Sequence, residues 1–358
     1  MAHQTSKPGL FGQPQGHSSR DYTQAYCWGK NQFNSSFPAS LVAYMHSKNL
    51  KPVYLRTDND NNVIHSKISA DALLGIDPLA DNAFYNYEAG FAPYERFYSG
   101  EREKIDLVMN DLAADNKPLV GLEVKLTALP DNTTKNRNED EYGAEMVVRP
   151  PTICFLACSM CANYATDERR IKLLKMLSVV PQINHWDEAD EVVRHYEAIE
   201  NAVITVCEDI NSSQAPLILQ PVWKTQGAKM RLADDCLDVF VWSNLALLQL
   251  CVRQSRTVGI SRFKRTVIWV YRMLFEYCVH GVFDYVRIIK QHSYTYANDK
   301  AFAVSGAISL PFMRCDELAY PRIGKNEIKN IILGGGQNLL SPERRFDAVL
   351  VNSPEIFD

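Results

Sequence analysis

Residues 101–131 read EREKIDLVMNDLAADNKPLVGLEVKLTALPD, and the predicted fold is built around this segment. Lys104 to Met109 begins with alternating polar and apolar side chains and then becomes apolar. Residues 111–118 supply turn-forming side chains, and Leu119 to Leu126 is a second apolar run. This pattern predicts two strands that are joined by a polar turn and pair as a hairpin.

Three charged side chains lie in these two predicted strands. Asp106 belongs to the first, and Glu123 and Lys125 belong to the second, where a spacing of two residues puts them on one face. Pairing of the strands can bring Asp106 opposite them. Carboxylates among apolar strands are costly to bury, and Mg²⁺ offsets that cost because it prefers oxygen ligands. A lysine beside the metal can orient or deprotonate a bound water, so this group suits hydrolysis of a phosphodiester.

Asp106, followed seventeen residues later by Glu123-Val124-Lys125, resembles the D…(D/E)-x-K signature of the PD-(D/E)xK nuclease superfamily. Ile105 stands where the superfamily usually has proline. The resemblance implies an α/β fold of the mixed α+β kind, with a restriction-endonuclease-like core in which helices flank a mixed central sheet. It also implies that Asp106 and Glu123 bind the metal ion and that Lys125 completes the catalytic group.

A second resemblance covers most of the chain. It rests on SKPGLFG at residues 6–12, WGKNQFNSSFPASL at residues 28–41, REKIDLV at residues 102–108 and GLEVKLTALPD at residues 121–131. These blocks are similar to the HindVP family of type II restriction endonucleases. The resemblance implies Mg²⁺-dependent cleavage of double-stranded DNA at a short palindrome of the GRCGYC kind, leaving 5′-phosphates. It further implies a bacterial cytoplasmic enzyme, with a cognate DNA methyltransferase that protects the host DNA. A palindromic target also favours a homodimer.

Two further groups of residues are candidates for the site. In the superfamily an acid ahead of the first motif strand sometimes completes the metal site, and Glu88 or Glu95 can fill that role here; the alternative is that both are surface acids.

Basic residues near the start of a long apolar segment are candidates for DNA contacts. The alternative interpretation is that they form a basic collar around a core helix. These are Arg253, Arg256, Arg262, Lys264 and Arg265.

Composition and charge narrow the classes of protein. The net charge is −4, with 46% hydrophobic and 22% charged residues, which is ordinary for a soluble globular chain. The sequence contains no run of eighteen apolar residues, so we expect no membrane span. Residues 1–10 are polar, and no apolar signal region follows a basic start, so we do not expect secretion. The charge is uneven, because residues 222–358 hold 18 Lys and Arg against 13 Asp and Glu. This excess of positive charge is typical of a region that contacts DNA phosphates. The alternative interpretation is an ordinary charged surface exposed to solvent.

The chain order predicts three regions: a flexible arm at residues 1–20, a nuclease core at residues 21–225, and a mostly helical basic region at residues 226–358 for DNA recognition and dimerisation. Within the core we expect a third strand at Gly143–Arg149, which with the helix after it gives the strand, strand, strand, helix order of the nuclease core, and a further core strand at Pro216–Lys224. We expect helices at 38–47, 68–74, 151–164, 167–177, 188–199 and 261–281, a hairpin at 51–67, and a helix or strand–helix pair at 237–252.

Three other functions compete with restriction. One is a repair or structure-specific nuclease on the same core, and another is a DNA-binding protein whose nuclease core is inactive. The third is a zinc or redox protein built on Cys158 and Cys161, two of the nine cysteines. Tetrahedral zinc needs a second ligand pair at similar spacing, and the sequence has none, which favours a packed helix.

Overall fold

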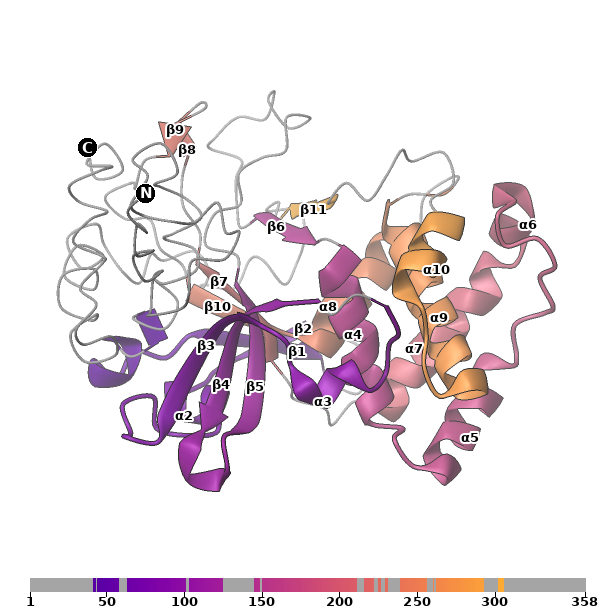
Figure 1. Ribbon diagram of the computed structural model, residues 1–358. Coiled ribbons are helices and arrows are strands. Elements are labelled where there is room, and N and C mark those ends of the chain that lie inside the picture. The colour runs from indigo at the N-terminus through magenta and orange to yellow at the C-terminus, as the bar shows by residue number, and fades with distance from the viewer. Residues whose placement is uncertain are drawn as a thin grey trace, which may run out of the picture.

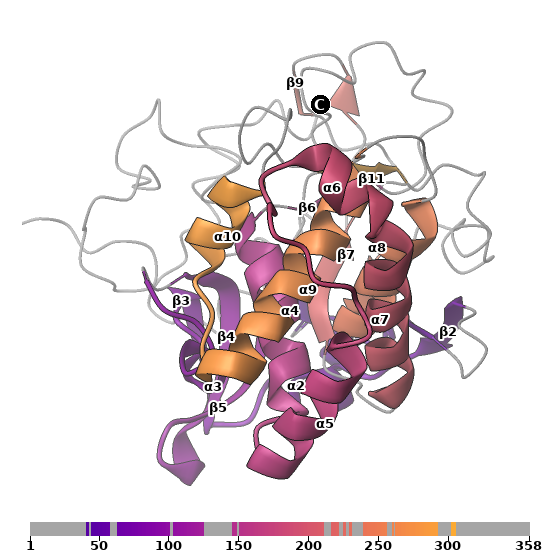
Figure 2. The same ribbon diagram turned by 90° about the vertical axis from the view of Figure 1, so that its right-hand side faces the viewer.

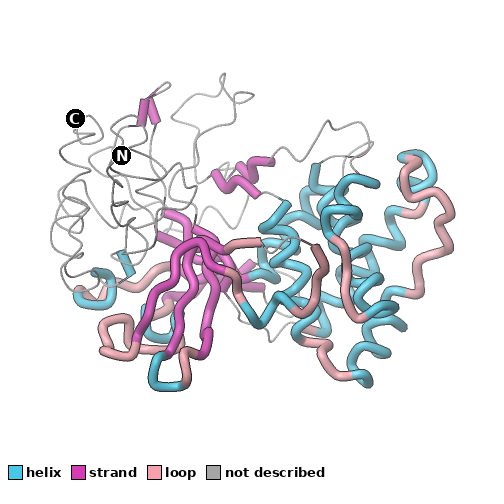
Figure 3. Tube along the Cα trace, in the orientation of Figure 1, coloured by secondary structure: helices cyan, strands magenta, loops and turns pink. Residues whose placement is uncertain are grey.

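The computed structural model describes residues 41–42, 44–57, 63–100, 103–124, 145–148, 150–210, 216–221, 225–226, 229–230, 239–255, 260, 262–292 and 302–305. These residues form a mixed α/β body. A twisted sheet lies on one side and a layer of helices packs against it (Figure 1). Turned by 90°, the helices lie in front of the sheet (Figure 2). Coloured by secondary structure, most of the strands lie on one side and most of the helices on the other (Figure 3).

The main sheet has seven strands within the described residues, in the order β2-β1-β10-β7-β5-β4-β3. Most neighbours are antiparallel, but β1 pairs with β10 and β5 pairs with β7 in parallel. The strands are β1 (Val53–Thr57), β2 (Val63–Lys67), β3 (Ala83–Ala89), β4 (Ile105–Asp111), β5 (Lys117–Val124), β7 (Pro216–Pro221) and β10 (Val239–Ser243).

The prediction of a third strand at Gly143–Arg149 is correct for the strand and wrong for its place. Strand β6 (Glu145–Val148) pairs with β11 (Phe302–Ser305) in a separate two-stranded sheet. The position beside β5 is taken by β7 instead, and β8 (Thr225–Gln226) with β9 (Lys229–Met230) forms a small ribbon. Local alternation predicts a strand, but it carries no information on which distant strand will be its partner.

The helical layer is organised around α9 (Arg262–His280), which packs against α4, α5, α7, α8 and α10. Gly281 ends this helix in the left-handed region at φ 77°, as the sequence predicts. The other helices are α2 (Ala70–Leu74), α3 (Ala92–Glu95), α4 (Pro150–Ala162), α5 (Asp167–Leu177), α6 (Ala189–Arg194), α7 (Tyr196–Asp209), α8 (Asn244–Gln254) and α10 (Tyr285–Gln291).

Strand β4 shows how the core is divided. Val108 packs in the cluster that includes Ile153 and Phe155 of α4. Leu107 and Met109, its neighbours along the strand, are also buried but lie outside that cluster. Ile105, the first residue of the strand, belongs to the same cluster as Val108. Strand β4 is therefore buried along most of its length, and Ile105 and Val108 join it to the core that includes α4.

Elements on both sides of residue 226 contribute to the main sheet and its core. Strand β10 lies between β1 and β7, and α8 and α9 pack into the same core as α4. The described part of the C-terminal region therefore completes the main body.

None of the helices that the structure describes has the length and apolar character needed to span a membrane.

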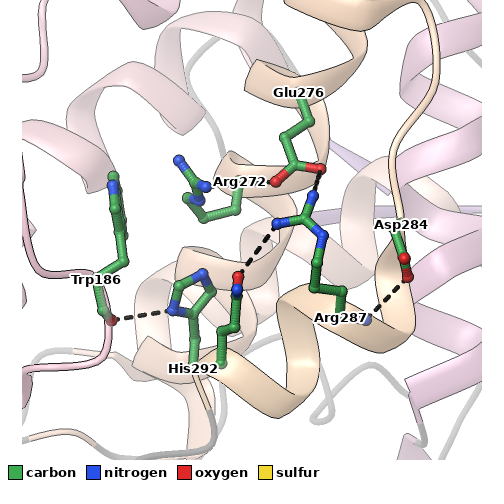
Figure 4. Close-up of polar contacts among 7 residues, drawn as sticks. Trp186, Arg272, Glu276, Asp284, Arg287 and His292 are labelled. Carbon is green, nitrogen blue, oxygen red and sulfur yellow. Dashed lines mark hydrogen bonds and ion pairs between the residues drawn. The ribbon is translucent and has the colours of Figure 1, made fainter.

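A buried histidine at the end of α10 joins that helix to the loop before α6 (Figure 4). His292 lies 2.9 Å through Nδ1 from the Trp186 carbonyl oxygen, and its own carbonyl accepts from Trp269 Nε1 at 3.1 Å. A carbonyl only accepts, so Nδ1 carries the proton. Burial, reinforced by the positive charge of Arg272, lowers the pKa of His292 to about 4.

We expect this histidine to make the protein sensitive to acid. The unfolded chain binds a proton at His292 near pH 6.5, while the folded chain resists protonation until about pH 4. The unfolded state therefore binds more protons in this window, and the free energy of unfolding falls by up to about 3 kcal/mol as pH drops through it. His292→Asn keeps an N–H for Trp186 but does not titrate. Urea unfolding at pH 7 and pH 4.5 should give a smaller loss for the variant than for the wild type, and equal losses would contradict this role.

Candidate active site

The predicted central hairpin is confirmed as β4 and β5. Asp111 ends β4 and accepts from the Ala113 amide at 2.9 Å and from Asn82 Nδ2 at 2.6 Å. Asp115 and Asn116 then take φ angles of 56° and 55°, a left-handed conformation that aspartate and asparagine tolerate better than most residues. The turn thus fixes the register of the two strands that carry the candidate carboxylates.

That register points Asp106 and Glu123 toward the same end of the hairpin. Leu107 pairs with Leu122 and Val108 with Gly121, and the same register, continued by one residue beyond the last pair, would set Asp106 opposite Glu123. Directly opposite residues on antiparallel strands have Cβ atoms about 5 Å apart. Both side chains are partly buried. Asp106 lies where β4 begins, and Glu123 lies where β5 ends.

The backbone register also separates the two candidates for an additional acid. Tyr87 pairs with Leu107 and Ala89 with Ile105, so Glu88 on β3 falls opposite Asp106 from the other side. Glu95 instead lies at the end of α3, where its carboxylate occupies the space that a Cβ on Gly90 would fill. Glu88, Asp106 and Glu123 therefore occupy one row across β3, β4 and β5, and Glu95 does not belong to that row.

The segment that leads into β4 is fixed by hydrogen bonds from residues that were not predicted from the sequence. Tyr285 of α10 donates a hydrogen bond to the Glu103 carboxylate, and the Glu103 amide donates to the Tyr98 hydroxyl at 3.1 Å. Burial raises the pKa of Tyr98 to about 12, so this hydroxyl stays protonated at neutral pH. These contacts tie the chain three residues ahead of Asp106 to the helical layer.

Glu123 is restrained from two directions. Its strand pairs with β4 on one edge and with β7 on the other, where Glu123 is in register with Ile218. From the helical layer, Thr152 Oγ1 donates to Glu123 Oε1 at 3.5 Å. Thr152 lies in the first turn of α4, where the sequence indicated only the start of a buried helix.

The remaining predicted site residues divide into two groups. Lys125 and Arg256 lie outside the described residues, and the side chains of Glu88, Arg253 and Arg262 are not described.

Lys264 and Arg265 are described, and they are only 8% and 2% exposed. Lys264 Nζ lies 4.9 Å from the ring centroid of Tyr196, and the Arg265 guanidinium lies 4.6 Å from that of Trp269. A cation over an aromatic face is a favourable buried contact. In this structure these two side chains therefore pack in the helical core, which favours the alternative of a basic collar on a core helix.

Among the side chains that the structure describes, no three His, Cys, Asp or Glu residues gather as a ready-made metal site. Asp106 and Glu123 provide two carboxylates. The third acid in their row, Glu88, is placed through its backbone alone. Two acids opposite each other on neighbouring strands repel, and a divalent cation relieves that repulsion, so the pair fits an oxygen-preferring metal such as Mg²⁺.

The cysteines behave as core residues. Cys158 and Cys161 of α4 are fully buried, and burial raises the pKa of both thiols. A thiol kept protonated is a poor metal ligand and a poor nucleophile. This burial favours the packed helix over the zinc or redox alternative.

Gly121 provides a test of how tightly the hairpin packs beneath the site. A Cβ at this position would lie 2.9 Å from Ile105 Cδ1 and 3.3 Å from the Phe91 ring, and both neighbours are buried. We expect Gly121→Ala to lower the free energy of unfolding by about 1–3 kcal/mol, because both neighbours are buried and at least one must shift to admit the new methyl group. Gly90→Ala meets only the flexible Glu95 side chain and should cost less. Denaturant unfolding measures both, and equal losses would contradict the tight packing at Gly121.

Comparison with known proteins decides the family. The sequence profile of the HindVP restriction endonuclease family matches residues 28–357, which is nearly the whole chain. The chain belongs to the HindVP restriction endonuclease family. This membership agrees with the resemblance of the blocks at residues 28–41, 102–108 and 121–131.

Two relatives in the family match over almost their full length. The Type II restriction enzyme HgiDI of Herpetosiphon aurantiacus is 38% identical over 362 residues, covering 100% of this chain and 99% of the relative. The Probable type II restriction enzyme HindVP of Haemophilus influenzae is 39% identical over 357 residues, covering 98% and 95%. No solved structure matches the chain.

Proposed function

We propose that this protein is a type II restriction endonuclease that hydrolyses phosphodiesters of double-stranded DNA at a short palindromic site with the help of Mg²⁺. The observation that supports the proposal is the register of β4 and β5, whose continuation by one residue would set Asp106 opposite Glu123 in a chain of this family. The names of the two relatives support the same class of reaction. A restriction-endonuclease-like core, acting in the bacterial cytoplasm, is part of the proposal.

The proposed site consists of three carboxylates and one lysine. Asp106 and Glu123 hold Mg²⁺, and Glu88 adds a third acid, because it continues their row on β3. When bound, the metal supplies positive charge that stabilises the scissile phosphate and lowers the pKa of a coordinated water. Lys125, two residues beyond Glu123, orients the attacking water or takes its proton. Attack in line with the 3′-oxygen leaves a 5′-phosphate.

Recognition of a palindrome needs two copies of the chain related by a two-fold axis. We propose a homodimer in which the part after residue 226 carries most subunit and base contacts. For a GRCGYC-like site, arginines that donate to guanine O6 and N7 are expected, and Arg253, Arg256 and Arg262 are the candidates. A cognate methyltransferase would protect the same site in the host.

One experiment tests function and specificity together. Purified protein is incubated with phage DNA in a buffer that contains Mg²⁺, and the ends of the fragments are sequenced. Discrete bands that share one end sequence with 5′-phosphates support the proposal. Cutting without a common sequence would point to a repair or structure-specific nuclease, and specific binding without cutting would point to an inactive core.

A further inference from the structure

Helix α4 contains two buried side-chain hydroxyl groups, and the hydrogen-bond partner of each indicates its role. The ten residues from Thr152 to Cys161 are all buried, and only Thr152 and Ser159 among them have polar side chains other than thiol or thioether groups. Thr152 is 0% exposed and Ser159 is 6% exposed. Burying a hydroxyl is unfavourable unless it finds a hydrogen-bond partner, so the partner of each hydroxyl shows what it does for the structure.

The two hydroxyls have different partners. Ser159 donates to the Leu156 carbonyl of its own helix at 2.7 Å, a local contact that many buried serines make. Thr152 donates out of the helix to Glu123 Oε1 at 3.5 Å, the long end of the hydrogen-bond range. In active sites without ligand such bonds are often long and shorten in the loaded complex. Thr152 is therefore the described α4 side chain that contacts a candidate metal ligand.

The surroundings make Thr152 a firm support. Pro150 and Pro151 open α4 and restrict the backbone of its first turn. The core around Ile153 and Phe155 holds the helix against the sheet. The partly positive amino end of the helix favours a nearby carboxylate. Pairing with β4 and β7 fixes the backbone of β5 at Glu123, and Thr152 adds a contact to the end of the side chain.

We propose that Thr152 is a positioning residue: its hydroxyl holds one carboxylate oxygen of Glu123 and so fixes the orientation in which this carboxylate meets the metal ion. The inference rests on the proposed function, because it assigns a role toward a metal that Glu123 would bind. Thr152 touches neither DNA nor metal in this scheme, and it acts only through Glu123. Its loss should weaken metal binding without unfolding the protein.

The test compares three variants of Thr152 with one matched control. Thr152→Val removes the hydroxyl and keeps the branched shape, Thr152→Ala removes it with a different packing defect, and Thr152→Ser restores it. Ser159→Ala removes the other buried hydroxyl of α4, whose partner is a backbone carbonyl. Calorimetric titration of Mn²⁺ into DNA-free protein measures metal binding directly, and the Mg²⁺ dependence of plasmid cleavage and the melting temperature complete the measurements.

We expect Thr152→Val and Thr152→Ala to weaken Mn²⁺ binding and to raise the half-saturating Mg²⁺ concentration, each about tenfold, the size of one hydrogen bond to a charged group. Thr152→Ser should stay within about threefold of the wild type by the same measure, and Ser159→Ala should change the melting temperature alone. Wild-type metal binding in Thr152→Val or in Thr152→Ala overturns the inference. If Asp106→Asn is inactive in the same assays, the proposed function still stands. A wild-type protein that neither binds the metal nor cuts DNA overturns both.

Discussion

Replacing Asp106 with asparagine should lower the rate of DNA cleavage by at least about a thousandfold, because stabilisation by a metal ion contributes several kcal/mol to the transition state. Asparagine has nearly the same size as aspartate, so the hairpin should fold as before. Removing one of two carboxylates that face each other across β4 and β5 also relieves their repulsion in the absence of metal. Thermal stability without metal should therefore be equal or higher, and binding to specific DNA should persist.

The matched control is Asp111→Asn, at the opposite end of the same strand. Asp111 accepts hydrogen bonds in the hairpin turn, and an asparagine oxygen can still accept from Ala113. Single-turnover cleavage of a plasmid and a gel-shift assay without Mg²⁺ compare both variants with the wild type. Asp111→Asn should cut at nearly the wild-type rate. Cleavage by Asp106→Asn at that rate would remove Asp106 from the site.

Replacing Glu276 with alanine should lower the free energy of unfolding by about 3 kcal/mol. Glu276 of α9 is 6% exposed and binds two arginines, Arg272 at 3.3 Å and Arg287 at 2.6 Å (Figure 4). Arg287 is 44% exposed and can turn toward water, but the Arg272 side chain is 16% exposed and lies against the Trp186 ring. Without Glu276, Arg272 loses the carboxylate that offsets its positive charge. The positive charge of Arg287 and the buried His292 lie nearby and do not replace that carboxylate.

Urea unfolding measures this effect, and Asp167→Ala is its control. Asp167 pairs with Arg170 within α5, but its side chain is 89% exposed. An exposed pair of this kind contributes only about 0.5 kcal/mol or less. A loss below about 1 kcal/mol for Glu276→Ala would show that Arg272 finds other compensation.

The hairpin and its carboxylates could be predicted because the sequence patterns that specify them lie within one short segment of the chain. The apolar runs around Asp106 and Glu123 alternate as strands do, and the polar segment between them contains the turn residues Asp115 and Asn116. Helix α5 was predicted with the same bounds, Asp167–Leu177, for the same reason. Its apolar positions repeat at helical spacing and Thr166 caps its first turn.

What could not be predicted depends on pairing between distant segments. Nothing in the local pattern of Glu145–Val148 distinguishes a core strand from a strand of a small outer sheet, and only its partner β11 decides. Strand β3 was missed because aromatic side chains stand on both of its faces and weaken the alternation. The rings that bury Lys264 and Arg265 include Tyr196, which belongs to another helix. The role of Thr152 depends in the same way on a residue 29 positions away.

The strand order of the main sheet has a consequence for biosynthesis. Strand β5, which carries Glu123, finds its second neighbour only in residues 216–221, and that neighbour in turn is flanked by residues 239–243. A nascent chain that has left the ribosome only as far as Val124 holds both carboxylates on a sheet with an open edge. A chain that ends before residue 216 therefore lacks the strand that closes this edge, and the main sheet can be completed only after about two thirds of the polypeptide has emerged.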